Sequence, residues 1–499
     1  MRTEDPSRPE AGAALREYLQ RIIDGHVPIG GGRPDASEVA GRADGVSGGQ
    51  SATRATRGSA VDPRQATDEG PESLGVFCPS QGEFVPLAPN SLPELRIRST
   101  DVEALILKFL LNCGTSTGLD IAKQIRLPLA LIAGLLRQLK EERLLVYKAA
   151  APAGDYLYEL TESGHERARR CWEQCTYFGA APVALRDYVA SVHAQSIRKQ
   201  NPKIADLRRA LKDLVIDPEM LVQLAQAANS GQGLFLYGPA GNGKTSIARR
   251  ITGAFGQAVW IPRAISVAGS VMRLYDPNNH EPLPLDDDRL SHCGRIDERW
   301  IRIRRPTIVV GGELTMENLE VRVNPTTAVS EAPVQLKSNC GTLAIDDFGR
   351  QRIRPDELLN RWILPLEKHF DILNMPNGNK IHVPFDQLLI FSTNLEPRDL
   401  VDEAFLRRIP YKVDVKNPPV DDFRNLLEHH ARALGICYHD APVDYLIEKY
   451  FAAAEREMRY CHPRDLMQQI YTYCTVLDLP MEITNEAIDA AARNYFAVL

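Results

Sequence analysis

Several features are missing from this 499-residue sequence, and each absence narrows the class of protein. The longest apolar run, residues 127–136, is far shorter than the roughly 20 residues that a membrane-spanning helix needs. The charged start, Met1–Glu10, precedes no apolar stretch, so we expect no secretory signal. The nine cysteines form no paired framework, which favours reduced thiols and a cytoplasmic protein. A basic excess is also missing, since 59 Lys and Arg stand against 65 Asp and Glu, a net charge of −6. This charge balance excludes a basic nucleic-acid-binding surface that extends over the whole chain.

The residues that are present predict a multidomain globular chain with a long tail. Apolar residues make up 44 %, enough to bury a core, and the length allows two to four domains at roughly 100–200 residues each. Residues 26–92 are rich in Gly, Pro, Ser, Asp and Arg and have few large apolar side chains. Such a segment cannot offset the entropy of ordering. We therefore predict that residues 1–94 are mostly a disordered tail.

Residues 95–172 carry the pattern of a small helical domain. Apolar spacing predicts three helices up to residue 143, two strands over 144–149 and 156–160, and a closing helix over 160–170. This order resembles a winged-helix domain, and a helical linker over 173–203 would follow it. Base reading needs polar side chains early in the third helix, but Pro128–Gly134 supplies none. The local charge balance is only +3, from 12 basic and 9 acidic residues. We therefore favour a role for this domain in contacting proteins. DNA binding is the less favoured alternative.

A glycine-rich loop begins directly after the apolar run Gly233–Tyr237 and leads into a helical stretch. It reads G-x-x-x-x-G-K-T, a phosphate loop in its required strand–loop–helix setting. Glycines let backbone N–H groups face the phosphates, a lysine reaches the β and γ phosphates, and a threonine hydroxyl can bind Mg²⁺. The residues assigned to nucleotide binding are Gly238, Pro239, Ala240, Gly241, Asn242, Gly243, Lys244, Thr245 and Ser246. The expected cofactors are ATP and Mg²⁺.

A pair of carboxylates follows the apolar strand Thr342–Ile345. In a parallel sheet these side chains would lie beside the phosphate loop. We expect Asp346 to hold Mg²⁺ together with Thr245, and Asp347 to orient the attacking water. The alternative is a plain turn after a buried strand, because Asp-Asp-Phe-Gly is turn-like. The phosphate loop about 100 residues upstream favours the metal site.

Further polar residues follow in a fixed order. Asn394 ends the predicted strand Gln387–Ser392, where it can contact the γ-phosphate or the water. Arg407 and Arg408 precede another strand, and Arg464 lies in a helical stretch near the end. Taken with the loop and the carboxylates, this order resembles the AAA+ ATPases over roughly residues 204–499. The implied fold class is α/β: an αβα P-loop domain at 204–418 and a helical lid at 419–499, after the winged helix and the tail.

The resemblance also implies roles and an assembly. Asn394 would be sensor 1, Arg464 would contact the γ-phosphate of its own subunit, and Arg407 or Arg408 would reach the nucleotide of a neighbouring subunit. All three roles count as catalytic, alongside Lys244 and Asp347. The physics agrees, because an added guanidinium stabilises the charge on a transferring phosphoryl group. AAA+ proteins usually form rings, so we expect a homo-oligomer, with a hexamer favoured.

Two departures from the family pattern affect function. Many members carry Asp-Glu where this chain has Asp346-Asp347, which leaves the hydrolysis rate open. The region of about 261–340 is a long insert with short strand patterns, such as Ile301–Arg304 and Thr307–Val310. Strands flanking Asn377-Gly378 predict a hairpin before sensor 1, as in the MoxR-like branch. A GAFTGA loop is missing, which disfavours the enhancer-dependent transcription activators.

The sequence thus predicts a Mg²⁺-dependent ATPase that remodels an unidentified protein client. The alternatives are a DNA-directed motor or loader, and a nucleotide-gated switch with little turnover.

Overall fold

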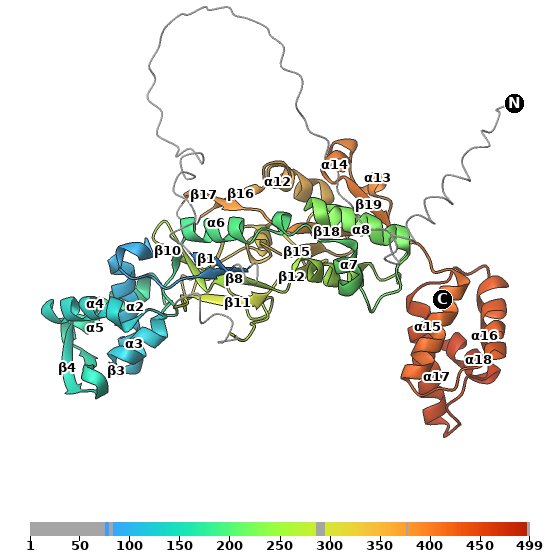
Figure 1. Cartoon of the computed structure of the whole chain (residues 1–499), viewed down its shortest axis with the longest axis horizontal. Helices are drawn as coiled ribbons and strands as arrows, with labels where there is room; N and C mark the ends of the chain where they lie inside the picture. Colours follow the sequence, from blue (N-terminus) through green and yellow to red (C-terminus); the bar gives the residue numbers. More distant parts are fainter. Residues whose placement is uncertain (1–74, 79–82, 286–294, 376–377, 497–499) are drawn as a thin grey trace, which may run out of the picture. The chain divides into compact units, whose positions relative to one another are not determined.

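The computed structural model of the chain describes residues 75–78, 83–285, 295–375 and 378–496 (Figure 1). Most of the predicted tail lies outside these ranges. Strand β1 (Gly75–Cys78) pairs with β2 (Glu83–Pro86), and a 3-10 helix η3 (Pro93–Leu95) follows. Phe84 and Val85 are buried in a cluster with Trp260 and Trp300. Ordered structure therefore begins before residue 95, because these apolar side chains find a partner surface in the insert.

Residues 99–174 contain the expected order of three helices, a hairpin and a closing helix. The helices are α2 (Ser99–Cys113), α3 (Gly118–Ile125), α4 (Leu129–Glu141) and α5 (Glu162–Gln174). The strands β3 (Thr115–Thr117), β4 (Leu145–Ala150) and β5 (Tyr156–Leu160) form an antiparallel sheet in the order β3-β5-β4, with a 3-10 turn η4 (Pro152–Gly154) in the hairpin. Thr161 caps the start of helix α5, and its side chain accepts a hydrogen bond from the Gly164 amide.

A five-stranded parallel sheet forms the centre of the next domain. Its order is β12 (Thr307–Val310), β15 (Thr342–Ile345), β18 (Leu388–Ser392), β7 (Leu234–Tyr237) and β19 (Tyr411–Asp414). All four pairings are parallel, so the residues that follow the strands meet at one edge. This confirms the predicted α/β fold class with a parallel sheet.

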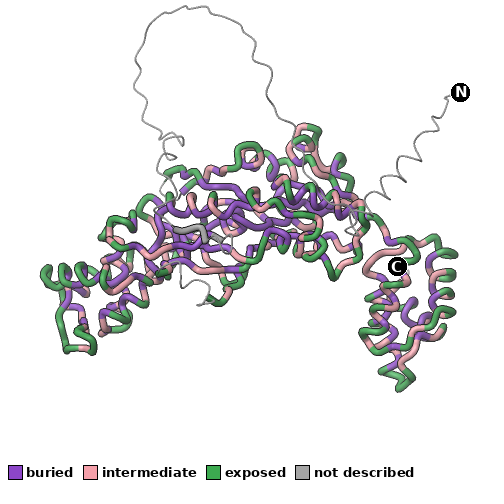
Figure 2. Tube along the Cα trace, viewed as in Figure 1, coloured by how far each residue is buried: buried purple, intermediate pink, exposed green. Residues whose placement is uncertain are grey.

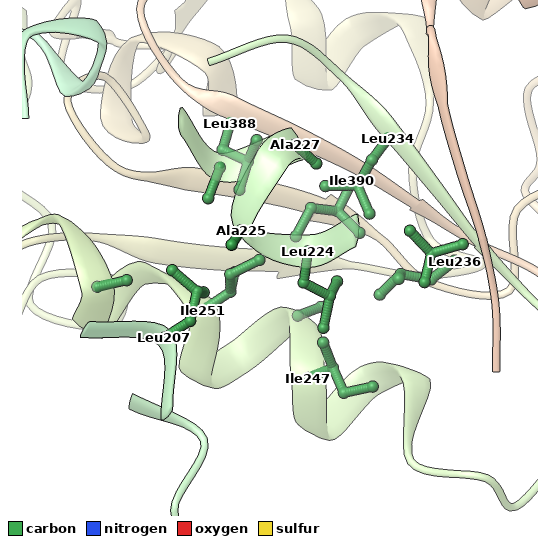
Figure 3. Close-up of a cluster of buried hydrophobic side chains, with 14 of the residues drawn as sticks. Leu207, Leu224, Ala225, Ala227, Leu234, Leu236, Ile247, Ile251, Leu388 and Ile390 are labelled. Atoms are coloured by element: carbon green, nitrogen blue, oxygen red, sulfur yellow. The ribbon is translucent and has the colours of Figure 1, made fainter. Parts of the chain in front are cut away.

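Alternate side chains of these strands enter two different cores. Leu234, Leu236 and Ile390 pack under α7 (Ile204–Ala210), α8 (Pro218–Ser230), α9 (Lys244–Arg250) and η6 (Ile251–Phe255), as Figure 3 shows. Phe235 and Phe391 point to the other face, where α12 (Pro355–Lys368) contributes Trp362. The three central strands, β15, β18 and β7, are buried along most of their length (Figure 2), as expected for a parallel sheet covered on both faces.

The insert builds smaller sheets beside this domain. Strand β8 (Ala258–Pro262) pairs with β11 (Trp300–Arg304). A second sheet has the order β13 (Arg322–Val323), β14 (Ser330–Glu331), β10 (Ser270–Arg273), β9 (Ala264–Val267) and β6 (Val183–Ala184). Short helices complete the region: η7 (Met316–Leu319) and α11 (Val334–Lys337) in the insert, and α6 (Leu185–Ala194) and η5 (Ile197–Lys199) in the preceding linker.

Two strands differ from the expected layout. Thr307–Val310, which the sequence pattern placed in the insert, is the edge strand β12 of the central sheet. The run of β-branched residues predicts a strand without saying which neighbour it pairs with. Strand β6 lies in the region expected to be a helical linker and pairs with β9 of the insert. The hairpin predicted before Asn394 is present as β16 (Phe370–Asn374) and β17 (Lys380–Pro384), although two residues of its turn lie outside the described ranges.

The C-terminal residues form a helical domain with its own core. Its elements are α15 (Val420–Ala433), α16 (Asp440–Ile447), a π-helical turn η8 (Glu448–Ala452), α17 (Cys461–Val476) and α18 (Asn485–Tyr495). Two short helices, α13 (Pro397–Leu400) and α14 (Glu403–Arg408), lie between β18 and β19. None of the described helices is long and apolar enough to cross a membrane.

Candidate nucleotide-binding site

The phosphate loop leaves β7 and ends where α9 begins at Lys244. Two of its glycines are required by close approach as well as by backbone conformation. Gly238 has φ +128°, and a Cβ there would lie 2.7 Å from the Val415 carbonyl oxygen. Gly241 has φ +87°, and its Cβ would lie 2.5 Å from the sulfur of Cys461. No larger side chain fits at either position, so both glycines are needed for the loop to adopt this conformation.

The Lys244 ammonium is buried at the centre of this loop, with 6 % of the residue exposed. It donates hydrogen bonds to the carbonyl oxygens of Gly238 (2.7 Å) and Pro239 (2.9 Å) and to Asn394 Oδ1 (2.7 Å). Burial lowers the pKa of Lys244, and the charges of Asp346 and Asp347 oppose that shift. The structure thus brings together a lysine and an asparagine that lie 150 residues apart.

The Thr245 hydroxyl donates to Asp346 Oδ2 at 2.7 Å, so the two predicted metal ligands are in contact. A hydroxyl and a carboxylate are oxygen donors of the kind that Mg²⁺ takes. The described residues contain no group of three or more His, Cys, Asp or Glu that could hold a metal without help. Mg²⁺ normally uses one or two protein ligands plus waters and substrate phosphates. The residues present therefore fit Mg²⁺ bound together with a nucleotide.

The turn after β15 is fixed by a residue that sequence reasoning missed. The Gln351 amide donates to the carbonyl oxygens of Asp346 (2.7 Å) and Asp347 (3.0 Å). Asp347 is exposed and has φ +50°, an uncommon backbone conformation outside glycine. The two carbonyl bonds from Gln351 hold the backbone of this turn. A glutamine in a turn is not a signal that a motif search would single out.

Asn242 connects the loop to the C-terminal helical domain. Its amide nitrogen donates to Val415 O (3.2 Å) and Asn417 Oδ1 (2.8 Å), and its oxygen accepts from the Tyr460 backbone N–H (3.3 Å). Of the remaining loop residues, Pro239 is half-buried and Ala240 is exposed. Ser246 is half-buried in α9 and accepts from Arg250 through its carbonyl oxygen. The loop is thus bonded directly to residues 417 and 460.

Arg464, the expected sensor of the lid, does not join this cluster through any contact among the described residues. Its guanidinium pairs with Asp465 at 2.7 Å, and 67 % of its side chain is exposed. Two other residues of the C-terminal helical domain lie nearer to the loop. The Cβ position of Gly241 is 2.5 Å from Cys461 and 3.8 Å from Arg459 Cδ, and the Arg459 charge also lowers the Lys244 pKa. Sequence reasoning missed Arg459, because the motif directs attention to residue 464.

Arg407 and Arg408 lie at the end of α14 and differ in their surroundings. Arg408 pairs with Glu367 at 2.7 Å and donates to the Ala404 carbonyl oxygen at 3.0 Å. Arg407 is exposed and forms no hydrogen bond or ion pair with any described residue. Both line a cavity with Gly233, which precedes β7, so they lie toward the strand end opposite the phosphate loop.

Comparisons with known proteins give a partial match and a set of distant structural likenesses. Residues 419–494 match a family described as a domain of unknown function, DUF8689. No curated protein matches the chain. The structure is similar to a point mutant of RuvB from Thermotoga maritima, with 12 % identity over 58 % of this chain and 73 % of that one and a TM-score of 0.34. It is also similar to NtrX from Brucella abortus in complex with ADP, with 15 % identity and a TM-score of 0.35. That match covers 56 % of each chain, so this chain spans little more than half of NtrX. Function therefore has to be argued from the site residues.

Proposed function

We propose that the chain is a Mg²⁺-dependent ATPase of the AAA+ type that converts ATP hydrolysis into conformational work. The observation that carries the proposal is the meeting of two contacts at one edge of a parallel sheet. Lys244 bonds to Asn394, and Thr245 bonds to Asp346, each at 2.7 Å. A lysine, a hydroxyl, a carboxylate and a strand-end amide around a glycine-rich loop form the set of groups that phosphoryl transfer needs.

Each residue has a role that follows from its position. Lys244 would exchange its bonds to the loop carbonyls for the β and γ phosphates. Thr245 and Asp346 would hold Mg²⁺, which neutralises charge on the transferring phosphoryl group when it is bound. Asn394 would orient the γ-phosphate or the water, and the exposed Asp347 would accept the proton of the attacking water.

We propose that a neighbouring subunit supplies a further positive side chain to the γ-phosphate. Arg407, which has no partner among the described residues, suits this role better than Arg408, because Arg408 is held by Glu367 in its own subunit. Such a site is complete only in a homo-oligomeric ring, for which a hexamer is the favoured size. Arg464, paired with Asp465, would have to leave that partner to act as a lid sensor.

We propose that the conformational work driven by ATP hydrolysis is the remodelling of a protein client in the cytoplasm. The domain of residues 99–174, with its winged-helix order of elements, would serve as the client adaptor. At the start of α4, Ala130 and Ala133 are exposed and Leu129 is half-buried, and all three are apolar. Apolar side chains at that place suit a protein surface better than the base edges of DNA.

A Lys244→Ala variant tests the ATPase proposal. It should lose nucleotide binding, measured with a fluorescent ATP analogue, and phosphate release, because the ammonium that reaches the phosphates is gone. Lys148→Ala is the charge-matched control, since Lys148 is exposed on the hairpin and pairs with Glu159. Circular dichroism checks that both variants fold. Wild-type turnover in Lys244→Ala would rule out the proposed site.

A second function, a DNA-directed motor, is favoured by one observation on the hairpin. The rings of Tyr147 and Tyr156 stack 4.2 Å apart, both are about 40 % exposed, and the Lys140 ammonium lies 5.2 Å from the Tyr147 ring. Exposed aromatic rings beside cations can stack on nucleic-acid bases. Fluorescence anisotropy of the full chain with labelled DNA at several salt concentrations tests this function. A salt-dependent affinity lost in Tyr147→Ala would favour it, and no binding at low salt would exclude it.

A further inference from the structure

Arg459, in the C-terminal helical domain, is a cation beside the phosphate loop. The residue is half-buried, and its guanidinium forms no hydrogen bond or ion pair with any described residue. Its Cδ lies 3.8 Å from the position that a Cβ on Gly241 would take, which is within contact distance of the loop. Burying a charge is unfavourable unless an opposite charge or a hydrogen-bond acceptor compensates it. A guanidinium in this position is therefore suited to an anion that the loop holds.

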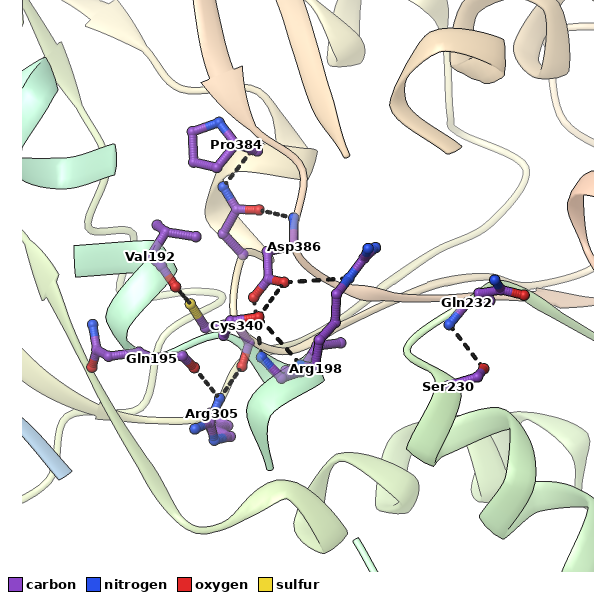
Figure 4. Close-up of polar contacts among 12 residues, drawn as sticks. Val192, Gln195, Arg198, Ser230, Gln232, Arg305, Cys340, Pro384 and Asp386 are labelled. Carbon is purple, nitrogen blue, oxygen red and sulfur yellow. Dashed lines mark hydrogen bonds and ion pairs between the residues drawn. The ribbon is translucent and has the colours of Figure 1, made fainter. Parts of the chain in front are cut away.

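Other arginines of the chain show how a buried charge of this kind is compensated within the protein. The Arg305 guanidinium donates to the carbonyl oxygen of Cys340 at 2.6 Å (Figure 4). Arg198, which is half-buried like Arg459, has its Nε 3.6 Å from a carboxylate oxygen of Asp386. Arg459 has neither kind of partner among the described residues. It thus differs from these structural arginines in the way expected of a residue that binds a ligand.

The charge of Arg459 also acts on the lysine of the phosphate loop. Burial lowers the pKa of the Lys244 ammonium, and the positive charge of Arg459 adds to that shift, against the effect of Asp346 and Asp347. Charges influence each other in this way only at short range, because salt screens them beyond about 10 Å. A ligand with several negative charges would attract both cations and offset their mutual repulsion. The two cations are therefore complementary to a polyphosphate.

The backbone of Arg459 is fixed on both sides. Its N–H donates to His462 Nδ1 at 3.2 Å, and its carbonyl oxygen accepts from the His462 N–H at 3.1 Å. His462 is itself buried among aromatic rings. The next residue, Tyr460, donates its backbone N–H to Asn242 Oδ1 of the loop at 3.3 Å. A residue held in this way loses little further freedom on binding, which favours a specific contact.

Arg464, which the AAA+ pattern assigns to the nucleotide contact, is bonded to another group. Its Nε and Nη2 lie 2.8 Å and 2.7 Å from Asp465 Oδ1. The other oxygen of that carboxylate accepts from the Tyr495 hydroxyl at 3.0 Å. Moving Arg464 to the nucleotide would break its bonds to Asp465, whereas Arg459 would lose no partner among the described residues.

We propose that Arg459, in place of Arg464, is the arginine with which the C-terminal helical domain contacts the γ-phosphate of ATP in its own subunit. The inference rests on the proposed function, because it needs ATP in the phosphate loop. Arg459 then acts within one subunit and Arg407 between subunits, and both stabilise charge on the transferring phosphoryl group. Loss of the γ-phosphate on hydrolysis removes the ligand of Arg459, which couples the state of the nucleotide to the C-terminal helical domain.

Binding of fluorescent ATP and ADP analogues to the full chain tests this assignment. A hydrogen bond to a charged group contributes about 1.5–3 kcal/mol, so Arg459→Ala should weaken binding of the ATP analogue about tenfold or more. Binding of the ADP analogue should change by less than about threefold, because ADP has no γ-phosphate. Arg464→Ala is the matched control: it removes the same charge from the same domain and should leave both affinities near those of the wild-type chain.

A merely structural role of Arg459 predicts a different result. It would lower the urea midpoint and weaken both analogues alike, whereas the proposal expects an unchanged midpoint and a loss confined to ATP. Arg459→Ala that binds the ATP analogue like the wild-type chain would overturn the proposal, and so would equal weakening of both analogues. The same holds if Arg464→Ala shows the ATP-specific loss. If circular dichroism shows that Arg459→Ala is unfolded, Arg459→Gln takes its place, with the same expected outcomes.

Lys244→Ala separates this inference from the ATPase proposal. ATP binding by the wild-type chain that is lost in Lys244→Ala supports the proposed nucleotide site, whatever Arg459→Ala shows. The behaviour of Arg459→Ala then decides the role of Arg459 alone. No binding of the ATP analogue by the wild-type chain would overturn both proposals together.

Discussion

The two adjacent arginines at the end of α14 give the sharpest test of the proposed ATPase. Arg407→Ala should abolish most turnover and leave the fold intact. Arg408→Ala should do the reverse, weakening the fold and leaving most turnover in place. The expectation follows from their partners, because Arg408 is held by Glu367 and the Ala404 carbonyl and Arg407 is exposed and unpaired in the described part of the chain.

The sizes of both effects can be worked from these contacts. The Arg408–Glu367 pair is half-exposed, with side chains 26 % and 44 % exposed, so it contributes about 0.2–1 kcal/mol. The bond to Ala404 O adds about 0.5–1.5 kcal/mol, giving a total loss of roughly 0.7–2.5 kcal/mol for Arg408→Ala. Arg407→Ala should change the free energy of unfolding by no more than about 0.5 kcal/mol. An arginine supplied in trans is worth about 10³–10⁵ in turnover, so Arg407→Ala should lose at least about a thousandfold.

Urea unfolding and phosphate release at saturating ATP measure the two quantities. A mixing experiment then asks whether the arginine acts on another subunit. Arg407→Ala keeps a complete phosphate loop, and Lys244→Ala keeps the arginine, so mixed rings of the two inactive variants should recover part of the turnover. Wild-type turnover in Arg407→Ala would refute the assignment of this residue. Inactive mixtures of variants that still assemble would refute action between subunits.

The other predictions concern the metal, two buried glutamines and pH. Thr245→Ala should bind ATP with an affinity that no longer responds to Mg²⁺. Thr245→Ser should keep the response, because the hydroxyl that contacts Asp346 remains. A Mg²⁺ titration of Thr245→Ala identical to wild type would contradict this. Gln387→Met should leave the free energy of unfolding unchanged or raise it, since it removes an unbonded amide. Gln335→Met should lower the free energy of unfolding by about 1–3 kcal/mol, because its amide nitrogen is bonded. Urea unfolding that ranks the two variants the other way would show that Gln387 is bonded in solution. Burial, aided by nearby arginines, lowers the pKa of His462 to about 4 in the folded chain, so the unfolded chain binds the extra proton between about pH 6.5 and 4. Stability should therefore fall as pH drops through that window, by up to about 3 kcal/mol from this residue, and urea midpoints of His462→Phe should show a shallower pH dependence.

Sequence alone could predict the phosphate-site cluster because its geometry is nearly a consequence of topology. Lys244 and Thr245 begin a helix after one strand, and Asp346 and Asn394 follow two others. Once the strands are parallel, their carboxyl ends share an edge, and side chains there have little freedom to lie elsewhere. The fold class and the neighbours of the loop therefore followed from local patterns. The catalytic roles of these residues remain predictions.

Other features depend on packing that no local pattern encodes. The short run Thr307–Val310 is equally suited to an insert sheet and to the edge of the central sheet, and its pairing with β15 was decided by distant residues. Arg459 lies near the loop because Gly241 admits Cys461 closely, a contact between segments over 200 residues apart. Gln351 stabilises the turn after β15 by donating hydrogen bonds to the carbonyl oxygens of Asp346 and Asp347. In each case the sequence shows the residue type, and only the tertiary contact shows its use.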